Sequence, residues 1–131
     1  MLSLEALHGG ARSSVCALVV DGDSEVKQGL ADLERSDYVK FHGLIRQLAE
    51  AGFIRNEQKF RRLEADIYEL KLSHPALRMF CFRHGDLWIC THVDRKPGKR
   101  RLQDHVVKVR ALRERLLMEG VHEDESCRVV S

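Results

Sequence analysis

The chain has 131 residues, 44% of them hydrophobic, which allows one domain with a real core and is too short for two ordinary domains. Lysine plus arginine exceed aspartate plus glutamate by only 22 to 20, so the total charge identifies no class of partner. The chain has no run near the roughly 20 apolar residues of a membrane span and no secretory signal pattern, so we expect a soluble, cytoplasmic protein without a membrane partner.

The chain begins with a segment, 1–13, that has no sustained periodicity and contains Gly9-Gly10. We expect a loose leader there. The fold is expected to begin with a strand over 14–20, a short apolar, β-branched run that Asp21-Gly22 ends. Such a run suits a strand covered on both faces.

Two helices are expected next, the first capped by Ser24 and the second by Ser36 or Asp37. The second helix has one apolar stripe at helical spacing, and Gly52 supplies its C-terminal stop. We expect the two to form a helical hairpin. The apolar residues are Val26, Leu30 and Leu33 in the first helix, and Tyr38, Phe41, Leu44, Ile45, Leu48 and Ala49 in the second.

After a basic connector, 55–62, strands are expected over 67–72, 77–83 and 87–93, separated by the turn residues of 73–76 and 84–86. A last helix over 102–119 ends before Gly120, and an acidic, flexible tail over 120–131 follows. The predicted fold class is α+β, with a single domain over 14–119 and the element order β-α-α-β-β-β-α.

The two predicted reversals set the strand register, and successive residues of a strand point to opposite faces. Lys71 is then opposite Arg78, and Arg78 is opposite His92. One face is nearly all apolar and is expected to pack on the helical hairpin. The opposite face carries a row of Lys71, Arg78 and His92, with aromatic residues at its far end: Phe80, Phe82 and Trp88.

Three adjacent cationic or titratable groups repel one another, and a bound anion relieves the repulsion. The chain continues from this row into 95–101, where five of seven residues are basic, so phosphate is the expected ligand. RNA cleavage by a 2′-hydroxyl needs a proton acceptor, a proton donor and cations around phosphorus. Arg78 suits the phosphate, and His92, Lys71 or Lys96 suits proton transfer.

We predict no metal site and no cofactor, because the four cysteines contain no CxxC pair and the proposed cleavage needs no metal. Each feature also has a purely structural interpretation. The basic run could be a solvated surface, His92 a surface residue, Arg78 a partner of Glu69, and the aromatic residues core.

Four short motifs follow one another within a region of about Val39 to Leu117: FRRL at 60–63, IYELK at 67–71, RMF at 78–80 and THVDRK at 91–96. A basic-x-leucine step precedes one strand, an arginine opens the next, and a basic pair follows the last. In this order and spacing the chain resembles the RelE/HigB toxin superfamily, especially its phage-derived branch.

The resemblance implies a RelE-like fold, ribosome-dependent cleavage of messenger RNA, and a small antitoxin partner, commonly a helix-turn-helix protein that also binds operator DNA. Lys71 and Arg78 match the family's strand cations, and Arg95 with Lys96 match its lysine pair. The chain departs from the pattern at Val93, where an aromatic residue is common, and it has no tyrosine in the last helix. The residues expected to bind RNA are Lys59, Arg61, Arg62, Arg95, Lys99 and Arg100.

Two other functions fit the same residues. A noncatalytic RNA- or DNA-binding module would use the basic face and lose affinity steeply with salt. A phage-derived interaction protein would dock a partner through an exposed apolar or basic surface.

Overall fold

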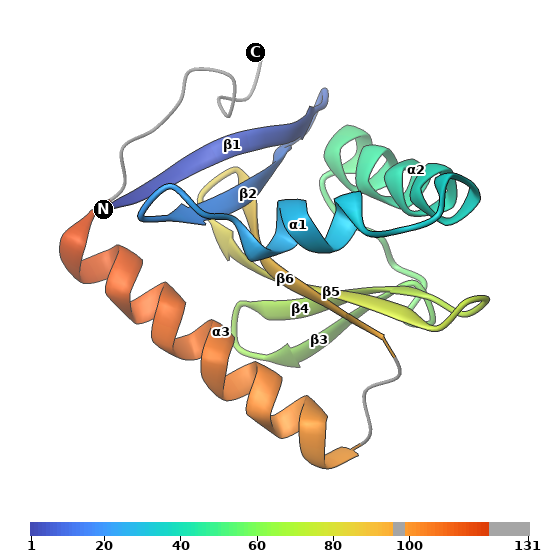
Figure 1. The fold of residues 1–131 in the computed structure, drawn as a ribbon. Coiled ribbons are helices and arrows are strands. Elements are labelled where there is room, and N and C mark those ends of the chain that lie inside the picture. The colour runs from blue at the N-terminus through green and yellow to red at the C-terminus, as the bar shows by residue number, and fades with distance from the viewer. Residues whose placement is uncertain (96–98, 121–131) are drawn as a thin grey trace.

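The computed structural model describes residues 1–95 and 99–120, with side chains described for 1–95 and 101–120. This part of the chain has an α+β fold, in which a six-stranded mixed sheet carries helices on both faces (Figure 1). The predicted fold class is confirmed at this level.

The sheet order is β1-β2-β6-β5-β4-β3, with β2 and β6 parallel and the other neighbours antiparallel. The strands are β1 (Leu2–Gly9), β2 (Ser14–Val20), β3 (Phe60–Glu64), β4 (Ile67–Leu72), β5 (Leu77–His84) and β6 (Leu87–Arg95). The helices are α1 (Glu25–Ala31), α2 (Arg35–Ala51) and α3 (Lys99–Glu119).

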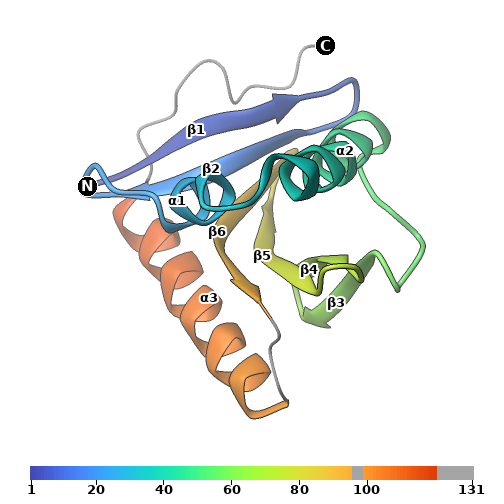
Figure 2. The ribbon, with the colours of Figure 1, turned by 45° about the vertical axis from the view of Figure 1, so that its right-hand side comes forward.

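The helices divide between the two faces of the sheet, as Figures 1 and 2 show. α1 and α2 cover one face, where Phe41, Leu48 and Trp88 belong to the same buried cluster. α3 crosses the other face, where Val109 packs with Phe80 and other apolar residues of the sheet. Each large apolar side chain buried in this way contributes roughly 1.5 to 3 kcal/mol.

Local signals placed several elements correctly. The strands predicted over 14–20 and 67–72 have those bounds in the structure. Ser24 caps α1 by accepting a hydrogen bond from the Lys27 backbone N–H. Gly52 ends α2 with φ 79°, the left-handed conformation that glycine adopts without strain. Glu34, rather than Ser36 or Asp37, is the N-cap residue of α2.

The predicted loose leader is wrong, because residues 2–9 form the edge strand β1. Leu4 pairs with Leu18 of β2 and is fully buried. Beyond the strand, the backbone N–H groups of Arg12 and Ser13 donate to the carbonyl of Ala49, at 3.2 and 3.0 Å. The turn between β1 and β2 therefore supplies hydrogen-bond donors to a backbone carbonyl in the last turn of α2. The predicted connector 55–62 likewise contains the start of a strand, β3.

The predicted register is confirmed between β4 and β5, where Lys71 is opposite Arg78. It is wrong between β5 and β6, where Arg78 is opposite Asp94 rather than His92. Two features cause the difference. His84 pairs with Leu87, which shortens the turn to two residues, and the register shifts again between Phe80 and Cys81.

These two irregularities act in opposite directions on the faces of β6. The shorter turn moves Trp88 and Cys90 to the face under the helical hairpin, and Leu87 and Ile89 to the face under α3. The second shift makes Thr91 the additional residue of a bulge, so that His92 returns to the α3 face.

No helix in the described ranges combines the length and apolar character needed to cross a membrane. Of the predicted acidic tail, residues 121–131 lie outside the part that the structure describes.

Candidate active site

Three side chains form a row across the α3 face of the sheet, one from each of three adjacent strands. Lys71 of β4 is opposite Arg78 of β5, which is opposite Asp94 of β6. Neighbouring strands lie about 4.8 Å apart, so the outer two backbones are about 10 Å apart with Arg78 between them. The row therefore places one carboxylate and two cations at one end of the sheet, and we call it the Lys71–Asp94 row.

Glu69 holds two arginines beside this row. Its carboxylate is fully buried and lies 2.8 Å from Arg61 Nη2 and 3.2 Å from Arg78 Nη1. The arginine side chains are 40% and 28% exposed, so both remain open to solvent. One carboxylate thus neutralises only part of the charge of the two guanidiniums, and the structural interpretation of Arg78 as a partner of Glu69 is confirmed as a contact.

Lys71 makes no ion pair with the described residues, although it lies among charged groups. Partial burial lowers the pKa of its ammonium, an effect that Glu69 opposes and that Arg61 and Arg78 reinforce. A hollow of about 300 Å³ is lined by both Lys71 and Arg78. A lysine with a lowered pKa beside a free hollow is a suitable proton donor.

A chain of hydrogen bonds leads from Asp94 into the protein. Asp94 Oδ2 lies 2.8 Å from His105 Nε2, His105 Nδ1 lies 2.8 Å from His92 Nε2, and His92 Nδ1 lies 2.8 Å from Thr91 Oγ1. The other carboxylate oxygen, Oδ1, accepts from Arg101 Nη2 at 3.3 Å. We call Thr91, His92, His105 and Asp94 the histidine chain.

One set of hydrogen-bond directions in the histidine chain follows if Asp94 is the acceptor at its end. An ionised Asp94 only accepts, so a neutral His105 donates from Nε2 and accepts at Nδ1. His92 must then donate from Nε2, which leaves its Nδ1 to accept from the Thr91 hydroxyl. In this assignment, with both rings neutral, the single Thr91 hydroxyl proton is donated to His92 Nδ1 at 2.8 Å rather than to the Phe80 carbonyl, which lies 3.4 Å from the same oxygen.

The burial of His92 agrees with this neutral state. Burial, together with nearby Lys108 and His105, lowers the pKa of His92 to about 4, although Glu25 and Asp94 oppose the shift. The Phe80 ring stacks on both imidazoles, with centroid distances of 4.9 Å to His92 and 4.6 Å to His105. His92 is only 4% exposed, so it does not lie on the solvated row where we predicted it.

The predicted RNA-binding residues divide between the two faces. Arg61 lies with the Lys71–Asp94 row, and the Lys59 carbonyl accepts from the Lys71 backbone N–H at 2.7 Å. Arg62 pairs with Tyr68, whose ring packs on the helical-hairpin side, and Arg95 donates to the carbonyl of Asp32 after α1. Lys96 and the side chains of Lys99 and Arg100 lie outside the described residues.

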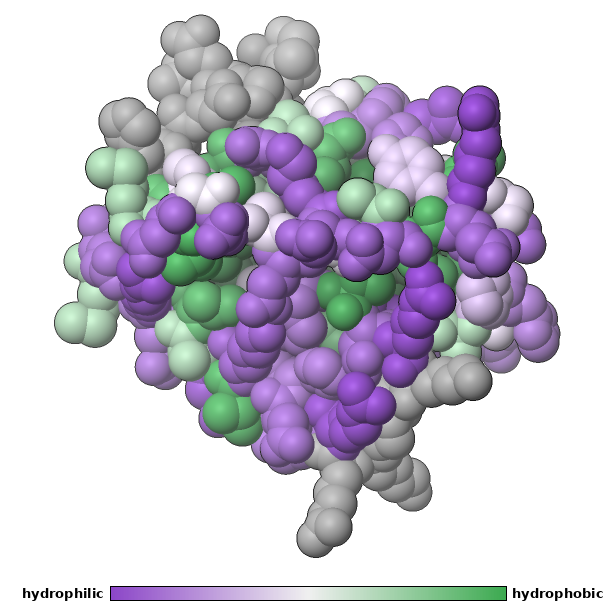
Figure 3. Space-filling model, in the orientation of Figure 1, coloured by the Kyte–Doolittle hydropathy of each residue, from purple (hydrophilic) through white to green (hydrophobic). Residues whose placement is uncertain are grey.

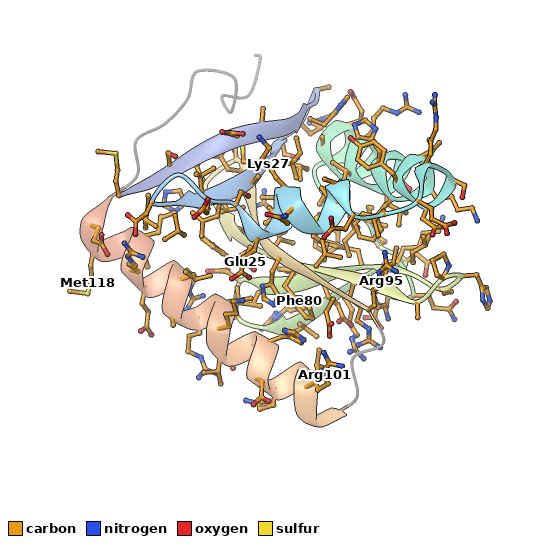
Figure 4. The ribbon with its side chains drawn as sticks, in the orientation of Figure 1. Glu25, Lys27, Phe80, Arg95, Arg101 and Met118 are labelled. Carbon is orange, nitrogen blue, oxygen red and sulfur yellow. The ribbon has the colours of Figure 1, made fainter. Side chains whose placement is uncertain are left out.

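The charged groups are spread over a mainly hydrophilic surface. Figure 3 shows small apolar islands among hydrophilic residues on the side where α1 and α3 face the viewer. Figure 4 places Arg101 near the start of α3 and Phe80 between the sheet and that helix. Among the described residues, no group of three or more His, Cys, Asp or Glu is arranged to hold a metal ion.

Sequence reasoning missed Asp94, His105 and the role of Glu69. His105 follows His92 by 13 residues in a different element, so no local spacing connects the two. Asp94 lies directly before the basic run 95–101, so the local charge pattern does not distinguish it from a solvated surface charge. The wrong β5–β6 register hid its position opposite Arg78.

Comparison of the sequence with models of known protein families and with curated proteins gave no match.

Proposed function

We propose that this protein is a toxin of the RelE/HigB type, which cleaves messenger RNA on the ribosome without a metal and is neutralised by an antitoxin. The antitoxin is expected to be a helix-turn-helix protein, and contact with operator DNA is expected only through that partner. The cytoplasm is the corresponding location.

The Lys71–Asp94 row is the observation that carries this proposal. Arg78, supported by Arg61, offers permanent positive charge for a phosphate. Lys71, with its lowered pKa, offers a proton beside the same hollow. Cleavage by a 2′-hydroxyl needs positive charge at the phosphate and a proton donor for the leaving oxygen, and Arg78 and Lys71 offer both.

The arrangement of elements also supports the proposal. A strand, a helical hairpin, a run of antiparallel strands and a last helix follow one another from β2 to α3. Apart from the edge strands, this is the element order that the sequence pattern predicts for the domain. The edge strands β1 and β3 extend that plan without altering it.

The test is induced expression of the protein without its partner. We expect growth arrest and messenger RNA cut on the ribosome, mapped by primer extension. Arg78→Ala should relieve the arrest and reduce cleavage by 100-fold or more, since it removes the cation at the centre of the row. A wild-type protein that neither arrests growth nor cuts translated RNA would exclude the toxin function.

Arg62→Ala is the matched control for Arg78→Ala. It removes the same charge from β3, two strands away from β5 in the sheet, and on the helical-hairpin face, which the proposed site does not use. We expect it to arrest growth as the wild type does. Equal relief by the two substitutions would indicate a general effect of charge rather than a site.

A noncatalytic RNA-binding module is a second candidate, favoured by the ion pairs between Glu69 and the two arginines. Those pairs hold the guanidiniums in place without any reaction. This candidate predicts RNA binding that is lost with Arg61→Ala and Arg78→Ala, with no cleaved product under any condition.

A further inference from the structure

Asp94 occupies a position that the proposed reaction requires and that no other described side chain of the row can fill. A 2′-hydroxyl that attacks phosphorus must lose its proton, and the leaving 5′-oxygen on the opposite side must gain one. Lys71 and Asp94 lie on opposite sides of Arg78 in the row. A phosphate held by Arg78 would therefore have a cationic acid on one side and a carboxylate on the other.

The Asp94 carboxylate is available for this role. Its side chain is 14% exposed, and each oxygen accepts one hydrogen bond, from His105 or Arg101. A carboxylate oxygen has two lone-pair sites, so each can accept a further proton. Arg101, which donates to Oδ1, and Arg78, on the neighbouring strand, place positive charge beside the carboxylate.

The histidine chain behind Asp94 fixes the direction of the carboxylate. Three consecutive contacts of 2.8 Å join it to two imidazole rings, each stacked on Phe80, and to a buried hydroxyl. Both nitrogens of each ring are used inside the chain, so neither imidazole has a nitrogen left to exchange a proton with the RNA. His92 and His105 are thus positioning residues, and the carboxylate is the member of the chain that can face the substrate.

We propose that Asp94 is the general base of the RNA cleavage and that Lys71 is its general acid, an inference that rests on the proposed function. The 2′-hydroxyl proton passes to an Asp94 oxygen as the 2′-oxygen forms its bond to phosphorus. The bond from phosphorus to the 5′-oxygen breaks, and that oxygen takes a proton from the Lys71 ammonium. The products are a 2′,3′-cyclic phosphate and a 5′-hydroxyl, and solvent restores both protonation states.

The experiment compares single-turnover cleavage by the full-length protein on ribosomes that carry a defined messenger RNA. Asp94→Asn keeps the shape and one acceptor oxygen but cannot take the proton. We expect its rate to fall by about 10²- to 10⁴-fold, with RNA affinity within about threefold of the wild type. A carboxylate base makes the cleavage rate decline at low pH, and we expect this decline to be absent in Asp94→Asn. The decline at high pH should be absent in Lys71→Gln, which lacks the ammonium.

Asp104→Asn is the matched control, because Asp104 is an exposed carboxylate on α3 near the same basic segment. It should cleave as the wild type does. If circular dichroism shows that Asp94→Asn is unfolded, His105→Gln takes its place in the test. We expect its cleavage rate to fall about tenfold, and the decline of that rate at low pH to occur at a different pH than in the wild type. If the wild type cleaves and both Asp94→Asn and His105→Gln cleave at the same rate, the assignment of Asp94 as the base is wrong, but the proposed function stands. If the wild type does not cleave, the proposed function is wrong.

Discussion

His92 shows how burial sets the charge of a single residue. Its ring lies between β6 and α3, and its pKa falls from the ordinary 6.5 to about 4. At neutral pH the ring is therefore uncharged in the folded protein. Protonation would place a charge beside Lys108 and would remove the lone pair that accepts the Thr91 proton.

We predict that the folded protein loses stability as pH falls from 6.5 to 4. In this window the unfolded chain binds a proton at His92 that the folded protein does not bind, so acid favours unfolding. This difference in pKa between the unfolded and the folded protein lowers the free energy of unfolding by about 3 kcal/mol at pH 4. Urea unfolding at several pH values measures it.

His92→Gln should flatten this dependence by about that amount, whatever its effect on stability at pH 7. His74→Gln, in the exposed loop between β4 and β5, should leave the dependence unchanged. The same slope in the wild type and in His92→Gln would show that His92 is not the titrating group.

At the scale of elements, β4 and β5 were predictable from the sequence, and β6 was predictable only in part. The β4–β5 loop carries turn residues that fix one register. β6 is apolar on both faces from Leu87 to Cys90, so its hydrophobic pattern cannot distinguish one register from the next. The bulge at Thr91 has no local signal either, and it decides which face His92 occupies.

β1 was missed for a different reason. Its buried Leu2 and Leu4 alternate with more exposed residues, as in a strand with one covered face. Gly9-Gly10 made the segment look like a flexible leader. In the structure Gly10 lies against the end of α2, where a Cβ atom would be 2.5 Å from the Ala49 oxygen and 2.7 Å from the Glu50 nitrogen.

We therefore predict that Gly10→Ala destabilises the protein by about 1 to 3 kcal/mol, because the new methyl group meets backbone that must move. Gly43→Ala is the comparison, since a Cβ at Gly43 meets nothing within 4 Å. It lies inside α2 and should stabilise by about 0.5 to 1 kcal/mol through helix propensity. Urea unfolding checks both, and a neutral Gly10→Ala would mean that the hairpin does not pack on α2 as described.

At the scale of the whole molecule, the segregation of charge could be read from the sequence, but its assignment to faces could not. Arg61 and Arg62 are adjacent in the chain, yet the strand directs them to opposite sides of the sheet. The net charge is only +2, so attraction to RNA depends on where the cations gather rather than on their number. Arg61, Lys71 and Arg78 gather on the α3 face.

This arrangement predicts how RNA binding responds to salt. Three phosphate contacts to a single strand give a slope of about −2 in a plot of log affinity against log salt, since each contributes about −0.7. Arg61→Ala should weaken binding and reduce the slope by about 0.7, whereas Arg62→Ala should change neither. Fluorescence anisotropy with a short single-stranded RNA, measured from low to physiological salt, gives both quantities. Equal losses from the two substitutions would mean that RNA is attracted by charge spread over both faces, because these adjacent arginines lie on opposite sides of the sheet.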